Sequence, residues 1–181
     1  MKVAEVMNPT VVSCSPEDLL SRAAQILWDE DCGCVPVVES GRLVGIVTDR
    51  DICMAAYTQG RPLAQLTVGG AMAKSLVSCK ATDPLATAFA LMGENAVRRL
   101  PVVDGEERLV GLISLADVVQ AANREKTKTR LKLADQLFET LVRLTQPRRP
   151  RPAPEPMAEA VLEPAPKKAQ SNKKKAAKAR A

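Results

Sequence analysis

The sequence predicts a mixed α/β (α+β) fold of two β-α-β-β-α repeats, followed by an amphipathic helix and a disordered basic tail. The chain aligns with itself at an offset of 65 residues, which one insertion raises to 66. Within each copy, strand-like runs and helix-like apolar spacings follow one another in the same order. The expected divisions are repeats at 1–57 and 68–122, a connector at 58–67, a helix at 123–146 and a tail at 147–181.

The alignment of the two copies depends on short sequence segments that match. Pro36-Val37-Val38 matches Pro101-Val102-Val103, and after the insertion Leu43–Ile46 matches Leu109–Leu112. Because so many matches recur at nearly constant spacing, they indicate a tandem duplication.

Each copy is expected to begin with a short strand of apolar and β-branched residues, Thr10–Cys14 or Leu76–Cys79. The first helices are expected to start at Pro16-Glu17-Asp18 and at Thr82-Asp83-Pro84, because acids and Pro suit a first turn. A β-hairpin and a short closing helix complete each copy. The hairpin strands are predicted at Val35–Glu39 with Leu43–Thr48 and at Leu100–Asp104 with Leu109–Ser114, and the closing helices at Asp49–Tyr57 and Leu115–Ala122.

After the repeats, apolar residues recur at spacings of three and four until Pro147, which ends the pattern. We interpret this helix as a packing or dimerisation arm, because a solvated helix would expose its apolar stripe. The rest of the chain is rich in Pro and Lys and cannot bury a core, which predicts disorder. The predicted stripe consists of Leu131, Ala134, Leu137, Phe138, Leu141 and Leu144.

Charge divides the chain into two parts. Residues 1–122 carry 10 Lys/Arg and 15 Asp/Glu, whereas residues 123–181 carry 16 Lys/Arg and 6 Asp/Glu, so the net charges are −5 and +10. The basic character therefore belongs to the C-terminal third. Aromatic residues make up 2% of the chain, which gives no support for a base-stacking surface.

The chain has no apolar run long enough for a membrane span or a signal peptide, so we expect no membrane partner and a cytoplasmic location. It contains five Cys and no His, which disfavours a zinc site. Cys32 and Cys34 are interpreted as small buried apolar residues, and Cys14, Cys53 and Cys79 as core residues. No metal ligand set is predicted.

A glycine, a hydroxyl and an acid recur at the end of both hairpins. Gly45, Thr48 and Asp51 match Gly111, Ser114 and Asp117. The structural interpretation is a capping box, in which the hydroxyl and the acid satisfy the free amides of a helix N-terminus. That interpretation alone explains the spacing.

The same geometry suits a nucleotide, which is the functional interpretation. A helix N-terminus attracts phosphate, the hydroxyls of Thr48 and Ser114 can contact it, and a carboxylate can accept hydrogen bonds from a ribose diol. The candidate phosphate contacts are Arg50, Arg98 and Arg99. Both interpretations remain open at this point.

The tandem repeat, the Pro-Val-Val strands and the G-h-h-[T/S]-x-x-D endings together resemble a pair of CBS domains, the regulatory modules named after cystathionine β-synthase. The resemblance covers residues 1–122, and the stretches NAVRRLPVVD and GRLVGIVTDRDI are similar to stand-alone bacterial versions. It implies two repeats packed with pseudo-twofold symmetry around two clefts, and a homodimer.

The resemblance also implies the ligand and its contacts. Asp51 and Asp117 would hold the ribose, Thr48 and Ser114 would contact phosphate or ribose, and apolar residues would line an adenine slot. The expected ligand is AMP, ADP or ATP, with S-adenosylmethionine or an NAD-like molecule as alternatives, and no cofactor is required. The two copies differ at the two positions between the matched hydroxyl and acid. The first copy has Asp49-Arg50 there and the second has Leu115-Ala116, so unequal sites are expected. The adenine slot is assigned to Val12, Val35 and Leu100.

These observations predict a non-catalytic sensor that relays the bound state to an unknown effector protein. The pattern supplies a carboxylate beside a hydroxyl, but the chain has no His and no nucleophile motif, so we expect no enzyme activity. The alternative is a dimeric scaffold whose basic tail, residues 167–180, binds nucleic acid or another polyanion. The other interpretation of this composition is a tail that only keeps the protein soluble.

Overall fold

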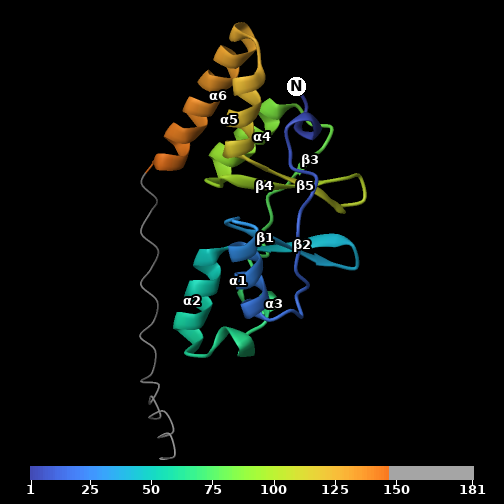
Figure 1. The fold of residues 1–181 in the computed structure, drawn as a ribbon, viewed down its shortest axis with the longest axis vertical. Helices are drawn as coiled ribbons and strands as arrows, with labels where there is room; N and C mark the ends of the chain where they lie inside the picture. The colour runs from blue at the N-terminus through green and yellow to red at the C-terminus, as the bar shows by residue number, and fades with distance from the viewer. Residues whose placement is uncertain (147–181) are drawn as a thin grey trace, which may run out of the picture.

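The computed structural model describes residues 1–146, which form two stacked halves. Figure 1 shows β1 and β2 lying beside β4 and β5 in the middle of the molecule, with the helices of each half on the outer sides. The predicted disordered tail at 147–181, with its cationic run at 167–180, lies outside the described residues.

The second repeat follows the predicted β-α-β-β-α order, and the first follows it with its opening strand reduced to an isolated bridge. The predicted mixed fold of two repeats is confirmed. The N-terminal half of the chain contains η1 (Val3–Glu5), α1 (Leu20–Asp29), β1 (Val35–Glu39), β2 (Arg42–Val47), α2 (Asp49–Gln59), η2 (Leu63–Gln65) and α3 (Val68–Ala71). The second contains β3 (Cys79–Lys80), α4 (Leu85–Asn95), β4 (Arg99–Val103), β5 (Leu109–Ser114), α5 (Leu115–Arg124) and α6 (Thr127–Thr145).

The two hairpins are built alike. β1 pairs antiparallel with β2, and β4 pairs antiparallel with β5. Each pair has a register shift at the same place, after Val37 in β1 and after Val102 in β4, and these two residues match in the internal alignment. The duplication therefore extends to the irregularities of the sheets.

The predicted first strands, Thr10–Cys14 and Leu76–Cys79, are too long. In the first repeat only Cys14 pairs with β1, as an isolated bridge, and in the second the strand is Cys79–Lys80. The physical reason is that Asn8 already pairs with Leu112 of the other sheet. The residues after Asn8 must cross from one sheet to the other, so only the end of the segment reaches its partner strand.

The predicted start of the first helix at Pro16-Glu17-Asp18 is also wrong, because α1 begins at Leu20. The side chain of Asp18 accepts a hydrogen bond from the amide of Ser15 at 2.8 Å, which holds these residues in a turn. The same bond recurs in the second repeat, where Asp83 accepts from the Lys80 amide at 2.8 Å. Here the acids fix the turn before the helix and do not form its first turn.

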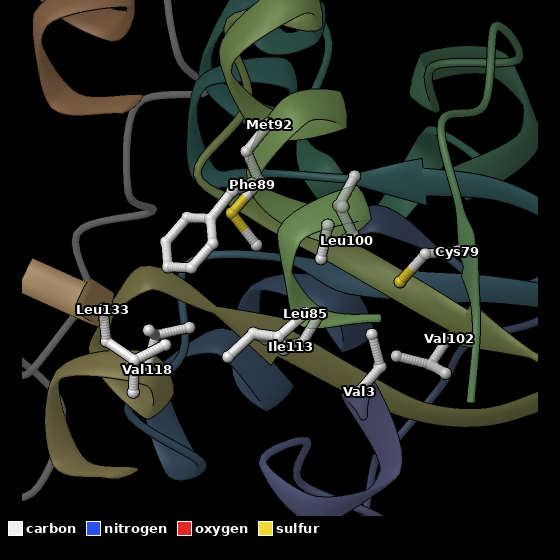
Figure 2. Close-up of a cluster of buried hydrophobic side chains, with 11 residues drawn as sticks. Val3, Cys79, Leu85, Phe89, Met92, Leu100, Val102, Ile113, Val118 and Leu133 are labelled. Carbon is white, nitrogen blue, oxygen red and sulfur yellow. The ribbon is translucent and has the colours of Figure 1, made fainter. Parts of the chain in front are cut away.

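The two halves exchange their N-terminal segments. Val3 is fully buried in the core of the second half, with residues such as Cys79 and Val102 (Figure 2). Its counterpart in the internal alignment, Val68, is fully buried in the core of the first half. Each half therefore depends on a segment that belongs, in sequence order, to the other copy.

This exchange explains the glycine of the repeated pattern. A Cβ atom added at Gly111 would lie 2.6 Å from Sδ of Met7, and one at Gly45 would collide with Sδ of Met72. Met7 and Met72 are equivalent in the repeat. The glycines let the incoming methionine cross the hairpin at close range.

Helix α6 packs against α4 and α5, as a packing arm would. The predicted stripe is partly wrong, because Leu131, Phe138 and Leu141 are exposed while Leu133 and Thr140 are buried. The helix has an inner and an outer apolar face. The residues predicted from the spacing include members of both, and Leu131, Phe138 and Leu141 belong to the outer face. The inner face closes the core of the second half, to which Leu133 contributes (Figure 2).

Candidate functional site

Both predicted capping boxes are formed. The amide of Asp51 donates to Oγ1 of Thr48 at 3.3 Å, and Oδ2 of Asp51 accepts from the amide and the hydroxyl of Thr48 at 3.0 and 2.7 Å. In the second repeat the amide of Asp117 donates to Oγ of Ser114 at 3.3 Å, and Oδ2 of Asp117 accepts at 2.8 and 2.6 Å. The structural interpretation of the pattern is therefore correct.

The capping boxes leave acceptors free for a ligand. In each box Oδ2 receives both bonds, and the hydrogen bonds recorded for residues 1–146 include none to Oδ1 of Asp51 or Asp117. All four side chains of the two boxes are half-buried, so they keep some contact with solvent. The cap therefore orients each carboxylate without using all of its hydrogen-bonding capacity.

The two helix N-termini differ in their free amides. At α2 the carboxylate of Asp49 accepts from the amide of Arg50 at 2.9 Å, so a negative charge already occupies this end. At α5 the amide of Leu115 donates to the carbonyl of Arg98 at 3.2 Å, whereas no acceptor is recorded within residues 1–146 for the Ala116 amide. The N-terminus of α5 is thus better prepared for an anion.

Arg99 connects the two halves at this edge of the molecule. It pairs with Ser114 across β4 and β5, and its guanidinium lies over Gly33 of the first half, 2.9 Å from the position of a Cβ atom there. Arg99 takes part in neither of the ion pairs recorded for residues 1–146. The backbone of Arg99 is therefore beside the N-cap of α5, while its cation reaches across to the other half.

The thiol beside this contact is neutral at physiological pH. Burial raises the pKa of Cys34 to about 11, while the nearby Arg99 cation opposes the rise and Cys32 and Asp49 add to it. Sequence reasoning did not find the approach of Arg99 to Gly33, because no spacing pattern links residues from different repeats.

The other predicted site residues lie in different surroundings. The side chains of Arg50 and Arg98 are exposed, beside the N-termini of α2 and α5. Of the three residues assigned to the adenine slot, Val12 is 39% exposed, whereas Val35 and Leu100 have no exposed surface and lie in the two cores. In this conformation only Val12 can touch a ligand.

Each capped helix lines one surface hollow on its outer side. One, of about 270 Å³, lies between α5 and α6, and the other, of about 340 Å³, lies between α1 and α2. The second contains the half-buried Cys32 and the exposed Cys53, so the expectation that Cys53 is a core residue was wrong. α2 buries Ile52 and Ala55, which turns the neighbouring Cys53 toward solvent.

None of the helices within residues 1–146 is both long and apolar enough to span a bilayer.

Comparison with known proteins identifies both repeats. The CBS domain family matches residues 3–57 and 68–124. The CBS domain-containing protein YhcV of Bacillus subtilis is 38% identical over 116 residues, which are 64% of this chain and 81% of YhcV. The sequence also resembles the inosine-5'-monophosphate dehydrogenase of Methanocaldococcus jannaschii, with 34% identity over 120 residues, 66% of this chain but only 23% of that enzyme.

A solved structure agrees with the architecture. The crystal structure of CBSX2 in complex with AMP aligns with a TM-score of 0.61 and 28% identity, over 68% of this chain and 96% of that one. Both repeats of the present chain thus match a family found in stand-alone proteins and as one part of larger enzymes.

Proposed function

Since the chain belongs to the CBS-domain family, we propose that it is a non-catalytic regulatory module that binds an adenine nucleotide or related adenosyl ligand. The observation that carries the proposal is the N-terminus of α5. There the amide of Ala116 can donate to phosphate and Oδ1 of Asp117 can accept from a ribose hydroxyl, next to Arg99, whose backbone pairs with Ser114. AMP is the first candidate, because CBSX2, a similar protein, was solved with AMP.

In the proposed binding mode, Asp117 accepts from the ribose hydroxyls through Oδ1, while its Oδ2 continues to cap the helix. Ser114 and the Ala116 amide lie on the phosphate side, where Arg98 and Arg99 add positive charge. Cap and ligand site are then one arrangement, because the helix end that the hydroxyl satisfies also attracts the phosphate.

A second, weaker site is proposed at α2, with Asp51 and Thr48 in the equivalent positions and Arg50 beside them. The carboxylate of Asp49 opposes a polyphosphate at this end, since like charges repel. We expect the first site to prefer AMP or an uncharged adenosyl group to ATP. Of the three residues assigned to the adenine slot, Val12 is the one accessible to an adenine ring.

The regulatory part of the proposal follows from the position of Arg99 between the halves. A ligand held by both halves binds one relative arrangement better than another and shifts the population toward it. A homodimer and an effector protein that reads this shift complete the proposal.

Thermal denaturation with a panel of ligands tests the function. We expect AMP to raise the melting temperature of the wild type. The rises caused by ADP, ATP, S-adenosylmethionine and NAD are compared with the rise caused by AMP. The matched variant is Asp117→Asn, which keeps the size of the side chain and a capping oxygen but loses the charge. The proposal fails if no member of the panel raises the melting temperature at millimolar concentration.

A second candidate function is motivated by the net charge of +10 on residues 123–181. We propose that the basic tail within this part, residues 167–180, binds a polyanion such as nucleic acid, with an affinity that falls steeply as salt is added. The comparison is a gel-shift salt series for the full chain and for the chain ending at residue 146. If both migrate alike, the tail has no part in such binding.

A further inference from the structure

The hollow of about 270 Å³ between α5 and α6, here called the α5/α6 hollow, has a mostly apolar lining and is open to solvent in the described part of the chain. Its α6 residues are spaced by four and then three, so they lie along one face of that helix. Leu141 continues this face and is 42% exposed. An apolar strip therefore runs from the last turns of α6 into the hollow. The lining consists of Val119, Gln120, Ala122, Asn123, Arg130, Ala134 and Leu137.

One segment of the chain after α6 has a composition that suits this hollow. Met157, Val161 and Leu162 are the only large apolar residues between positions 147 and 181. They lie within residues 155–163, here called the acidic segment, which contains three Glu and no Lys or Arg. The acidic segment lies outside the described residues. Because large apolar side chains gain free energy on leaving water, this segment favours an apolar partner.

Charge decides which of the two surface hollows suits the acidic segment. The α5/α6 hollow is lined by one cation, Arg130, and no acid, whereas the hollow between α1 and α2 is lined by Asp49 and no cation. The Glu side chains are therefore attracted to the first hollow and opposed by the second. The acids Asp135 and Glu139 of α6 lie about 100° and 140° around the helix from Ala134, so they do not face the hollow. The charged residues where α5 meets α6 are Arg124, Glu125, Lys126 and Lys128.

The chain between α6 and the acidic segment is long enough to bring the segment back to the hollow. Helix α6 ends at Thr145, and Ala134 in the hollow lies about 16 Å before this end, at 1.5 Å per residue. Residues 146–156 can span about 36 Å when extended. A tether of this length gives a local concentration on the order of millimolar, so a contact too weak to join separate molecules is populated within one chain.

We propose that residues 157–162 fold back and bury their apolar side chains in the α5/α6 hollow of the same chain. Val161 and Leu162 cover the apolar lining, and the Glu residues of the acidic segment lie toward Arg130. The docked segment holds the start of the basic tail beside α5, because Lys167 follows Leu162 by only a few residues. Figure 1 shows the pair of helices that forms this docking surface. The contact goes beyond the proposed function and does not depend on nucleotide binding.

Cleavage by a glutamate-specific protease measures how often the acidic segment is undocked. The peptide bond after Glu159 must leave the hollow before it can enter the protease, so its cleavage rate follows the undocked population. Glu155 and Glu163 precede Pro and are poor cleavage sites, so Glu159 reports for the segment. Mass spectrometry of the full-length chain over a time course separates this cut from cuts elsewhere.

Two pairs of variants change the hollow and leave the tail sequence intact. Val119→Asp puts a charge into the apolar lining, and we expect cleavage after Glu159 to be about 2- to 10-fold faster than in the wild type. Val142→Asp is the matched control, because Val119 and Val142 are 46% and 47% exposed and Val142 does not line the hollow. Both controls should cleave at the wild-type rate, and circular dichroism checks that every variant is folded. The second pair is Arg130→Glu with its control Lys132→Glu.

This second pair tests the charge argument separately. Arg130→Glu replaces the cation of the hollow by an acid, so it should also speed the cleavage after Glu159. Lys132→Glu makes the same change of charge about 160° around α6 from Arg130 and should have no effect. Arg130 is exposed, so its replacement tests docking even if Val119→Asp disturbs the fold.

Changes in the tail should be seen at the hollow. In the ¹⁵N-labelled full-length chain, replacing Val161 and Leu162 by Asp should shift the amide resonances of Ala122 and Ala134, which line the hollow. The matched control is Ala176→Asp/Ala177→Asp, which adds the same charge outside the acidic segment and should leave these two amides unchanged.

Three results would overturn the proposal. The first is an equal rate of cleavage after Glu159 in the wild type, Val119→Asp and Arg130→Glu. The second is the absence of an amide shift at the hollow when the apolar residues of the tail are replaced. The third is protection that increases with protein concentration, because the tail of a second copy would then occupy the hollow. Docking within one chain predicts protection that is independent of concentration.

Discussion

Asp49 is the residue that makes the N-termini of the two capped helices unequal in charge. Its carboxylate holds the amide of Arg50 at the N-terminus of α2, where a phosphate would otherwise find a donor and a favourable dipole. In the second repeat Leu115 replaces it and leaves no negative charge at that position. The difference in charge, and not the shared Thr/Ser and Asp, should decide which end accepts a polyphosphate.

Removing this charge should improve the first site. For Asp49→Ala we expect the affinity for ATP at α2 to rise about 2- to 5-fold, the range of a helix-terminus charge effect. Calorimetric titration of the variant and the wild type measures it. Glu94→Ala is the control, since it removes an exposed acid from α4 without touching α2. Equal ATP affinity in the wild type and in Asp49→Ala would contradict the role given to Asp49.

Two buried thiols predict a loss of stability in alkali. Burial raises the pKa of Cys34 and of Cys79 from 9.0 to about 11 in the folded chain. Above pH 9 the unfolded chain loses these protons while the folded chain keeps them, so the stabilising difference is complete below pH 9 and is lost as the pH rises toward 11. The Cys34→Ala/Cys79→Ala variant should lack this part of the decline. Urea denaturation over that range checks it, and parallel curves for both proteins would refute the assignment.

At the scale of elements, each hairpin depends on the methionine that crosses it. The contact at Gly111 is the harder one to relieve, because an added Cβ atom would also lie 3.0 Å from the backbone carbonyl oxygen of Asn8. That carbonyl accepts from the amide of Leu112 at 2.9 Å and cannot move freely. At Gly45 the obstacle is the flexible side chain of Met72 alone.

We therefore expect Gly111→Ala to destabilise the protein by about 1–3 kcal/mol and Gly45→Ala by less, as overpacking does. Chemical denaturation measures both. Gly105→Ala is the control, because nothing lies within 4 Å of a Cβ atom there, and it should be nearly neutral. Adding Met72→Ala to Gly45→Ala should relieve the clash. Three equal effects would show that these close approaches do not limit the hairpins.

The elements also show where sequence reasoning succeeds. The strands Val35–Glu39 and Leu109–Ser114 were predicted with their observed bounds, because their apolar patterns and turns are local features. The capping boxes were predicted because hydroxyl and acid are three residues apart. The start of α1 was missed, because Asp18 accepts from the Ser15 amide in a turn. The same residues would also suit the first turn of a helix, and their spacing does not distinguish the turn from the helix.

At the scale of the whole molecule, contacts between distant segments were out of reach of the sequence. The exchange of Val3 and Val68 between the halves and the approach of Arg99 to Gly33 depend on how the repeats stack. The inner face of α6 was missed for the same reason, because a helix with two apolar faces needs a partner to identify the buried one. The internal alignment nonetheless indicated which positions to compare once the stacking was known.

The exchange makes the halves interdependent. Each core contains a residue from the segment that precedes the other repeat, Val3 in the second half and Val68 in the first. A ligand at the edge where Arg99 crosses between the halves therefore acts on one connected body. This arrangement gives the proposed nucleotide signal a route from the N-terminus of α5 to the other half.

The central claim is that an adenine nucleotide binds at the N-terminus of α5, and its most direct test is a nuclear magnetic resonance titration with AMP. In the ¹⁵N-labelled chain, we predict saturable shifts that are largest at the amides of Ala116, Ser114 and Asp117, with smaller ones around Gly33 across from Arg99. The Asp117→Asn variant should lose them. Shifts confined to other surfaces, such as the hollow between α1 and α2, or no shift at millimolar AMP, would contradict the claim.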